Sequence, residues 1–447
     1  MSKKKIKSSK TKEKSARAYA LDDLLIWFES TTIRFKDRKN FNLPANFALY
    51  RLIISNVIRY RDRYLFLIEK ITKRPLKKLD LYVQVVLMIG IAQLDQEEKL
   101  DDYAVVNETV ALMNYLKKPY LKGFINGSLR SYLRTRESLE KSLLNQKLSL
   151  QSSHPEWMVQ RWEAFYGTEQ TRLICHFNNQ TPQINLVLNP KFEKEKLLEQ
   201  FKKANFSYEE LDSGGFLIHN PNGLFDSEMY RSGSFLVQDF SAQLINTILK
   251  PLSKKRILDA CASPGGKLFN LEWTADDQIE KLVGIEISKG RFKRLIENKK
   301  RYQSQAEIIC QDVLALDEHQ NQFECVLLDA PCSATGTIRK HPEIKWSRQL
   351  DDFKFNQQKQ LQLLNHLKKT VCQNGYLIYS TCSMEPEENQ QVIEIFLKEN
   401  HEQFELIQMD PQNIPTSMIT VEGYYQHLPS QQGMGAFAAL LKRKCNF

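Results

Sequence analysis

The chain has 447 residues, of which 42% are hydrophobic, and it carries a formal net charge of +10. At roughly 150 residues per domain, this length predicts about three domains. No segment has the ~20 continuous apolar residues of a membrane-spanning helix. The eight cysteines lack the spacing of a disulfide framework or of a zinc site. We therefore expect a cytoplasmic, monomeric protein that has no membrane partner and binds no metal.

The positive charge is concentrated at the start of the chain. Residues 1–17 hold eight lysines or arginines against one acid, Glu13, and so contribute +7 of the +10. A segment of this composition binds polyanions such as nucleic acid. A solvated, disordered tail without a specific role is an equally good interpretation of the same residues.

Residues 18–145 show helical periodicity and no convincing strands. The segment 81–94 is almost entirely apolar, which predicts a helix at the centre of a bundle. The helix that opens with Asn107-Glu108-Thr109-Val110 is followed by a segment that reads Gly-Phe-Ile-Asn-Gly-Ser-Leu-Arg over 123–130. These two motifs resemble the all-helical, RNA-binding NusB family. A helical scaffold domain is the alternative.

A small α+β unit, which we expect to bind RNA, follows over residues 146–245. Residues 141–155 are polar, rich in serine and glutamine, and predict a linker that ends at His154-Pro155. Strands are expected at 184–188 and 215–218, with an amphipathic helix over 193–203 between them.

From Ile257 onward, apolar strands alternate with helical segments, which predicts a doubly wound, Rossmann-like α/β domain over 246–447. The expected helices cover 288–300, 356–372 and 386–399. The expected strands are Ile257–Ala260, Leu282–Glu286, Glu307–Cys310, Cys325–Asp329, Tyr376–Thr381, Phe404–Gln408 and Ala436–Leu441.

A glycine-containing turn, Cys261-Ala262-Ser263-Pro264-Gly265-Gly266-Lys267, follows the first of these strands and opens a helix. Glycines allow the backbone to approach a ligand closely, and amides at the start of a helix can face it. The turn has neither the G-x-G-x-x-G fingerprint nor the Gly-Lys-Ser/Thr of a P-loop, which disfavours a dinucleotide or a triphosphate.

Acidic residues follow the next three strands of the expected sheet, namely Glu286, Asp312 and Asp329. Each one alone is more often a cap or a solvated turn residue. Because the carboxyl ends of parallel strands line one ligand crevice, the three acids and the glycine turn together predict a nucleoside cofactor. A nucleoside without a need for phosphate binding fits S-adenosylmethionine.

Two cysteines follow neighbouring strands, Cys332 after Asp329-Ala330-Pro331 and Cys382 between Thr381 and Ser383. Either cysteine alone is more often a packing residue. Carbon 5 of a pyrimidine becomes nucleophilic only after a thiolate adds at carbon 6, which is a form of covalent catalysis. Such a thiolate needs a polar or electropositive site. The pair of cysteines beside Asp329 therefore favours methylation of a pyrimidine.

Three segments, 259–267, 329–336 and 380–383, resemble the signature motifs of the RNA cytosine-5 methyltransferases of the Nol1/Nop2/Sun class. With a NusB-like domain in front, the chain is similar to the members of that class that act on bacterial small-subunit ribosomal RNA. The resemblance implies that Cys382 is the nucleophile and that Cys332 assists release of the adduct. It also implies that Asp329 hydrogen-bonds the cytosine and that Lys267 positions the base or the methyl donor.

The resemblance further assigns S-adenosylmethionine to one set of residues: Cys261, Ala262, Ser263, Pro264, Gly265, Gly266, Lys267, Glu286, Asp312 and Asp329. The sequence departs from the usual family pattern at Ser263 and Leu268 in the glycine turn. It departs again at Val187, where the family has an arginine, and at Met434, where it has an acid.

The expected partner is ribosomal RNA, with the target cytosine in a single-stranded or flipped-out state, because a stacked base cannot reach a thiolate. The segment 339–346 is basic and contains one tryptophan, so we expect it to contact RNA; an ordinary solvated loop is the alternative. Three other functions stay open. They are the same chemistry on transfer RNA or large-subunit RNA, a non-catalytic RNA-binding or assembly factor, and a different enzyme on the same fold, such as a dehydrogenase.

Overall fold

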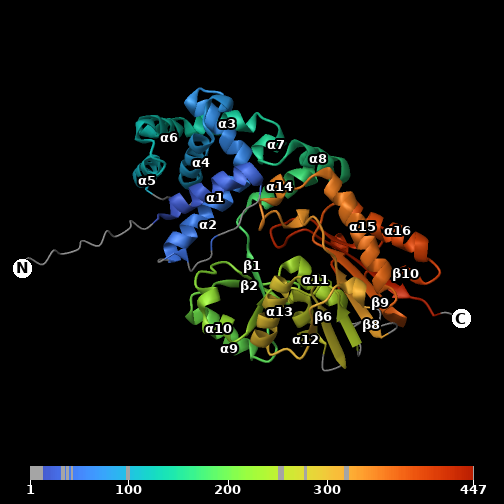
Figure 1. Cartoon of the computed structure of the whole chain (residues 1–447). Helices are drawn as coiled ribbons and strands as arrows, with labels where there is room; N and C mark the ends of the chain where they lie inside the picture. Colours follow the sequence, from blue (N-terminus) through green and yellow to red (C-terminus); the bar gives the residue numbers. More distant parts are fainter. Residues whose placement is uncertain are drawn as a thin grey trace, which may run out of the picture. The chain divides into compact units, whose positions relative to one another are not determined.

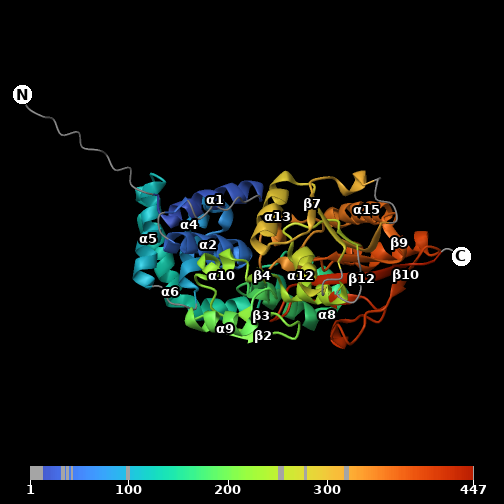
Figure 2. The same cartoon turned by 90° about the horizontal axis from the view of Figure 1, so that it is seen from below.

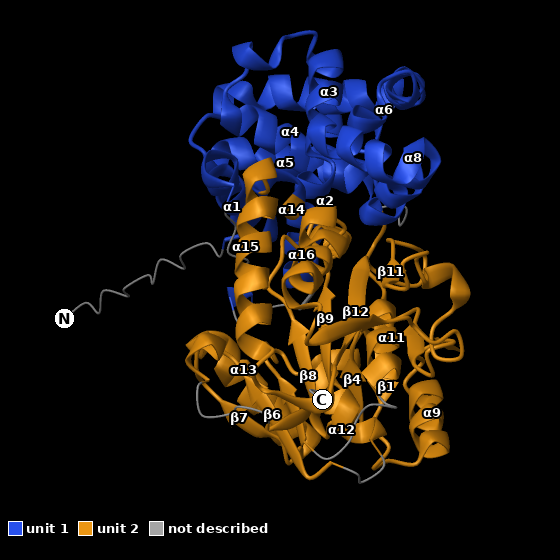
Figure 3. Cartoon of the chain, turned by 90° about the vertical axis from the view of Figure 1, so that its right-hand side faces the viewer, with its two compact units in different colours: residues 1–179, 345–347 blue, residues 180–344, 348–447 orange. Residues whose placement is uncertain are grey.

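A computed structural model describes residues 14–31, 36, 40–41, 44–96, 101–249, 256–275, 279–316 and 322–445. The chain forms two compact units, residues 1–179 with 345–347 and residues 180–344 with 348–447 (Figure 3). Of the predicted basic tail, residues 1–13 lie outside the described residues. Among the described residues, no helix has both the length and the apolar character needed to cross a bilayer.

The first unit is entirely helical, and it contains the expected bundle (Figure 1). The predicted central helix is α4 (Leu81–Leu94), which is buried along most of its length and packs against five other helices. The other helices are α1 (Ala16–Ser30), α2 (Pro44–Arg59), α3 (Arg61–Thr72), α5 (Asp102–Tyr115), α6 (Lys122–Leu144), α7 (Leu148–Gln151) and α8 (Glu156–Asn179).

The predicted linker over 141–155 is instead part of the folded first unit. Helix α6 continues to Leu144, α7 follows, and Ser153 and His154 are buried. The Ser153 hydroxyl accepts a hydrogen bond from the backbone N–H of Asp62 at 3.0 Å, and the His154 ring packs edge-on against Trp162. These long-range contacts order a segment whose composition alone indicates a loop.

Part of the basic loop 339–346 is buried as well, contrary to the expectation that it meets RNA. The ammonium of Lys345 donates to three carbonyl oxygens of the first unit, at 2.6, 2.7 and 3.2 Å: those of Arg59, Ser153 and the Asn179 side chain. The Trp346 indole donates to the backbone carbonyl of Ile58 at 2.7 Å. The polar and aromatic groups of these two residues are thus used within the fold.

Arg339 is also buried, at 5% exposure, and its guanidinium donates to the backbone carbonyls of Thr181 and Ser430. Only Lys340 and His341, among the basic and histidine side chains of this loop, are exposed. The loop therefore offers RNA far less positive charge than its sequence indicates.

The second unit begins with a small antiparallel sheet in the order β2-β3-β1-β4. The sequence analysis expected two of its strands, β1 (Ile184–Leu188) and β3 (Phe216–Ile218), and missed β2 (Tyr208–Glu210) and β4 (Phe235–Val237), which are only three residues long. Two helices accompany it, α9 (Lys194–Lys203) and α10 (Glu228–Arg231). Its core consists of buried side chains that include Leu186, Phe201, Phe216 and Phe235.

The large sheet has the order β10-β12-β9-β8-β5-β6-β7, with β11 paired to β12. Its strands are β5 (Arg256–Asp259), β6 (Lys281–Ile285), β7 (Glu307–Ile309), β8 (Phe323–Asp329), β9 (Val371–Thr381), β10 (Phe404–Ile407), β11 (Tyr425–His427) and β12 (Ala436–Arg443). Strands β5 to β9 are parallel, and β12 runs antiparallel between β9 and β10. Chain order reverses at β5, which is where a doubly wound sheet binds its ligand.

Helices cover both faces of this sheet, as a doubly wound fold requires (Figure 2). One layer comprises α11 (Phe240–Leu249), α12 (Gly266–Thr274) and α13 (Lys289–Tyr302). The other comprises α15 (Leu350–Leu367) and α16 (Gln390–Asn400), and the short α14 (Ile344–Ser347) precedes them. The helix expected over 356–372 begins earlier because Gln349 and Asp352 form a capping box.

Candidate active site

The two strand-end cysteines meet at the carboxyl edge of the sheet. Asp329, the last residue of β8, pairs with Ser380 on the parallel strand β9. The two turns that follow bring Cys332 Sγ to 3.4 Å from Cys382 Sγ, and both cysteines are free thiols. The pairing of β8 with β9 thus brings together two cysteines that lie fifty positions apart in the sequence.

An ion pair joins the aspartate of β8 to the glycine turn. The Lys267 ammonium lies 2.6 Å from Asp329 Oδ2, and the Ser380 hydroxyl donates to Asp329 Oδ1 at 2.8 Å. Burial alone would lower the pKa of Lys267, but the Asp329 carboxylate outweighs burial and raises that pKa above its ordinary value. Lys267 is thus a charged ammonium next to the cysteine pair.

A cavity of about 80 Å³ opens onto these groups. Lys267, Asp329 and Cys382 line it, together with Asp239 from the segment that precedes α11. Among the described residues, Cys332 is not part of the lining and lies behind Cys382. The two cysteines are therefore not equivalent, since a molecule in the cavity meets Cys382 first.

The surroundings of the Cys332 sulfur favour its protonated form. The hydrogen bond to Cys382, and then burial, raise the pKa of the Cys332 thiol well above its usual range. Its sulfur lies within hydrogen-bond distance of Cys382 Sγ.

A buried glutamate, Glu388, holds both cysteine-bearing turns. The hydroxyls of Ser333 and Ser383, each next to one cysteine, donate to Glu388 Oε2 and lie 3.1 Å from each other. Glu388 Oε1 accepts the Ser333 N–H at 2.8 Å and the Asn356 amide at 2.7 Å. The carboxylate is fully buried, and it fixes the register of the two Cys-Ser dipeptides.

Gly336 allows the backbones around the cysteines to touch. Its N–H donates to the Cys382 carbonyl at 2.9 Å, and its own carbonyl accepts from the Gly435 N–H at 2.9 Å. A Cβ atom at this position would lie 2.6 Å from the Gly435 carbonyl oxygen. Only glycine permits this approach.

The glycine turn after β5 is shaped for close contact with a ligand. Gly265 has a φ of +102°, and a Cβ there would lie 2.1 Å from the Phe269 ring. Burial, and then the Asp329 charge, raise the pKa of Asp259 to about 7. Burial likewise raises the pKa of the Cys261 thiol. The backbone N–H of Cys261 donates to Asp259 Oδ1 at 3.3 Å. Cys261 is thus an uncharged member of the turn.

The acids after β6 and β7 each retain one open oxygen. Glu286 Oε1 accepts the Ser288 N–H at 2.7 Å and pairs with Arg291 at 3.2 Å, and Oε2 has no partner among the described residues. Asp312 caps the short 3₁₀ helix 313–315 through Oδ1, and its Oδ2 has no partner in the same described set. Open carboxylate oxygens beside a glycine cradle fit a ligand that carries hydroxyl and amine donors.

The sequence analysis missed three residues of this site: Asp239, Ser380 and Glu388. Asp239 lies just before α11, outside the strand-end positions that the sequence analysis considered. Its Oδ1 accepts from Ser241 and from the Met434 backbone N–H, so the departure at Met434 leaves a backbone contact intact. Glu388 had no sequence signal, because its partners lie on distant turns. Among the described residues, no group of three or more His, Cys, Asp or Glu could hold a metal ion.

A doubly wound sheet with helices on both faces, a glycine turn after β5 and acids at the next strand ends defines an α/β domain of the methyltransferase type. Comparisons with known proteins agree. Residues 246–442 match the family described as 16S rRNA methyltransferase RsmB/F, residues 14–134 match the NusB family, and residues 154–222 match a ferredoxin-like domain of RsmF/B-like methyltransferases.

Relatives resemble the chain over most of its length. Ribosomal RNA small subunit methyltransferase B of Pasteurella multocida is 34% identical over 89% of this chain and 88% of the relative. The same-named protein of Photorhabdus laumondii is 35% identical over 76% and 80%. The chain therefore belongs to the RsmB/F family of 16S rRNA methyltransferases, and it is an rRNA methyltransferase.

Solved structures share the fold. The crystal structure of PH0851 superposes with a TM-score of 0.73 at 21% identity, covering 96% of this chain and 97% of the other. NSun6 from Pyrococcus horikoshii with SFG gives a TM-score of 0.58 at 17% identity, over 65% of this chain and 99% of that one.

Proposed function

We propose that the chain transfers a methyl group from S-adenosylmethionine to carbon 5 of a cytosine in small-subunit ribosomal RNA, through a covalent bond between Cys382 and carbon 6. One observation carries the proposal. Cys382 faces a cavity that the Asp329–Lys267 ion pair also lines, and its sulfur lies 3.4 Å from that of a second cysteine, Cys332.

The Cys382 thiolate forms the S–C6 bond, and the electron pair of the C5–C6 double bond moves toward N3 of the ring. Asp329 and Lys267 hold the ring by its polar edge and stabilise the charge that develops there. S-adenosylmethionine, held by the glycine turn, would supply an activated methyl group to C5 and would leave as S-adenosylhomocysteine. Transfer of the C5 proton to solvent water and cleavage of the S–C6 bond then restore the C5–C6 double bond and the Cys382 thiolate. Cys332, in contact with the Cys382 sulfur, assists this last step.

The proposed cofactor site is the turn 261–267 together with Glu286, Asp312 and Asp329. Support comes from the cradle at Gly265, which a side chain would fill, and from the open oxygens of Glu286 and Asp312. We assign the ribose hydroxyls to Glu286 and an adenine amine to Asp312. The proposed domains are a NusB-like domain over 18–145, a small α+β unit within 146–245 and the catalytic domain over 246–447.

The names of the relatives support small-subunit ribosomal RNA as the substrate. We also infer a cytoplasmic location, because bacterial ribosomal RNA is cytoplasmic. Incubation of the protein with isotope-labelled S-adenosylmethionine and a 16S rRNA transcript, followed by mass spectrometry of the nucleosides, tests the proposal. The expected product is labelled 5-methylcytidine. Label on a ribose or on another base would contradict it.

A further inference from the structure

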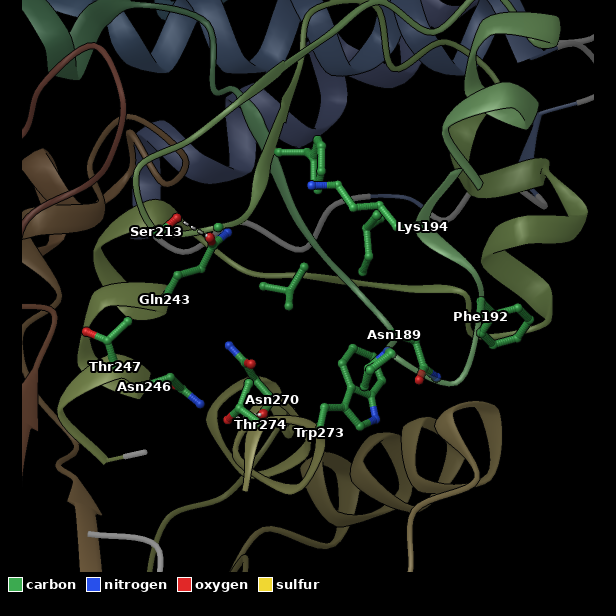
Figure 4. Close-up of a pocket in the computed structure, with 15 residues that line it drawn as sticks. Asn189, Phe192, Lys194, Ser213, Gln243, Asn246, Thr247, Asn270, Trp273 and Thr274 are labelled. Carbon is green, nitrogen blue, oxygen red and sulfur yellow. Dashed lines mark hydrogen bonds between the residues drawn. The ribbon is translucent and has the colours of Figure 1, made fainter. Parts of the chain in front are cut away.

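A second and larger cavity lies apart from the proposed catalytic and cofactor residues. It has a volume of about 320 Å³ and lies between the small sheet and helices α11 and α12. Figure 4 shows its side chains around one central space, with Gln243, Asn246 and Thr247 from α11 on the left and Asn270 and Trp273 from α12 below. Residues 189–194 close the opposite side.

Four buried side-chain amides line this cavity: Asn189, Gln243, Asn246 and Asn270, each at most 4% exposed. Three of them are held by hydrogen bonds through both of their polar atoms. Asn270 differs, because its Nδ2 donates to Gln238 at 2.6 Å, whereas its Oδ1 has no partner among the described residues. Asn270 is only 4% exposed and lines an open cavity, so its acceptor without a protein partner points to a ligand that donates a hydrogen bond.

The lining is neutral and aromatic. Among the described residues that line it, the one charged side chain is Lys194, whose ammonium is paired with Glu210 at 2.7 Å, so these walls do not suit a phosphate. Phe192, Phe216 and Trp273 supply flat apolar surface between the amides. A planar heterocycle with polar edges matches such walls, because aromatic side chains stack bases and amides read their edges.

We infer that this cavity binds an unpaired nucleobase of the RNA substrate, distinct from the cytosine that is methylated. The inference rests on the proposed function for the identity of the RNA. Helix α11 lines both cavities, since Ser241, Ala242 and Ile245 face the catalytic cavity while Gln243, Asn246 and Thr247 face this one. The Asn246 amide also donates to the Lys267 carbonyl at 2.9 Å. A base held here orients the RNA relative to Lys267.

Two measurements test the inference. In the first, adenosine, guanosine, cytidine and uridine are titrated separately while tryptophan fluorescence is recorded. At least one nucleoside is expected to quench the tryptophan fluorescence of the wild-type protein saturably. The same nucleoside is expected to leave the fluorescence of Trp273→Phe unchanged. In the second, binding of a 16S rRNA transcript is compared for Phe192→Leu and for Phe225→Leu. Phe225 is an exposed aromatic residue of the same unit that does not line the cavity.

Phe192→Leu is expected to weaken RNA binding about tenfold, so that KM for RNA rises while kcat at saturating RNA stays unchanged. The control Phe225→Leu is expected to bind RNA as the wild type does. Absence of saturable quenching would overturn the inference. So would quenching combined with unchanged RNA affinity of Phe192→Leu, which would mean that the cavity takes a free nucleoside. If saturable quenching and weaker RNA binding by Phe192→Leu are both observed but no 5-methylcytidine forms, the proposed reaction is refuted and the inference of a base-binding cavity is retained.

Discussion

Cys332 Sγ lies 3.4 Å from Cys382 Sγ, and only Cys382 lines the catalytic cavity. The hydrogen bond to Cys382, and then burial, raise the pKa of Cys332. This asymmetry supports a division of roles in which one cysteine attacks and the other assists release. Strand-end position in the sequence does not distinguish the two residues.

Because Glu388 accepts hydrogen bonds from both cysteine-bearing turns, we expect Glu388→Gln to lower both the free energy of unfolding and the rate of methylation. Glutamine keeps the shape but replaces an acceptor for two hydroxyls with an amide, and a hydrogen bond to a buried charge stabilises a protein by about 2 kcal/mol. Misplacement of the cysteine turns lowers kcat by roughly ten- to hundredfold. Chemical denaturation and single-turnover methylation measure the two effects. Glu394→Gln, an exposed site on α16, is the matched control. Equal stability and equal methylation rates of the two variants would contradict the role of Glu388 in holding the cysteine turns.

The Lys267 ammonium predicts the reactivity of Cys382. Lys267→Met removes a positive charge from the cavity that Cys382 lines, so alkylation of Cys382 by iodoacetamide at pH 7 is expected to slow roughly tenfold. Mass spectrometry of the Cys382 peptide gives the rate. Lys281→Met removes a lysine paired with Glu307 at the surface and leaves the rate unchanged. An unaltered rate in Lys267→Met would show that the ammonium does not act on the sulfur.

The raised pKa of Asp259 predicts a pH-dependent gain in stability for Asp259→Asn. Between the ordinary carboxyl pKa and about 7, the folded protein holds a proton that the unfolded chain has lost, so stability falls as pH rises through this window. Asparagine removes that penalty, which is on the order of a few kcal/mol. Thermal unfolding is therefore expected to show a larger increase in Tm at pH 8 than at pH 5. The same increase at both values would refute the shifted pKa.

Burial of Lys345 predicts a structural role in place of RNA contact. Lys345→Met leaves three carbonyl oxygens without their donor and lowers the free energy of unfolding by about 3 kcal/mol. The urea midpoint measures this loss, with exposed Lys340→Met as the control. The salt dependence of RNA binding is expected to stay unchanged in folded Lys345→Met protein. A reduced salt slope with normal stability would restore the RNA-binding interpretation.

Local signals predicted much of the catalytic domain. The expected strands of the large sheet match β5 to β10 and β12 because apolar runs ended by Gly, Pro, Asp or Cys are visible within a few residues. Because these residues follow the predicted strands, the same signals also predicted that Lys267, Asp329, Cys332 and Cys382 lie at one edge of the sheet. Strand β11, only three residues long, gave no such run.

The failures share a different cause. Lys345 and His154 both lie in polar segments, yet both are buried. Lys345 hydrogen-bonds to Ser153, more than 150 residues away in the sequence, and the His154 ring packs against Trp162 of α8. Glu388 reads as a solvated acid in Glu385-Pro386-Glu387-Glu388, and its role depends on two turns that meet only after strand pairing. A single sequence does not display contacts that folding creates between distant segments.

The most direct test of the account is a trapping experiment with Cys332→Ala. Incubation of this variant with a 16S rRNA transcript and S-adenosylmethionine is expected to accumulate a covalent protein–RNA complex, seen as a shifted band in denaturing gels. The same complex is expected to be absent from the Cys332→Ala/Cys382→Ala double variant. Full methylation by Cys382→Ala, with no complex formed by Cys332→Ala, would contradict the assignment of Cys382 as the nucleophile.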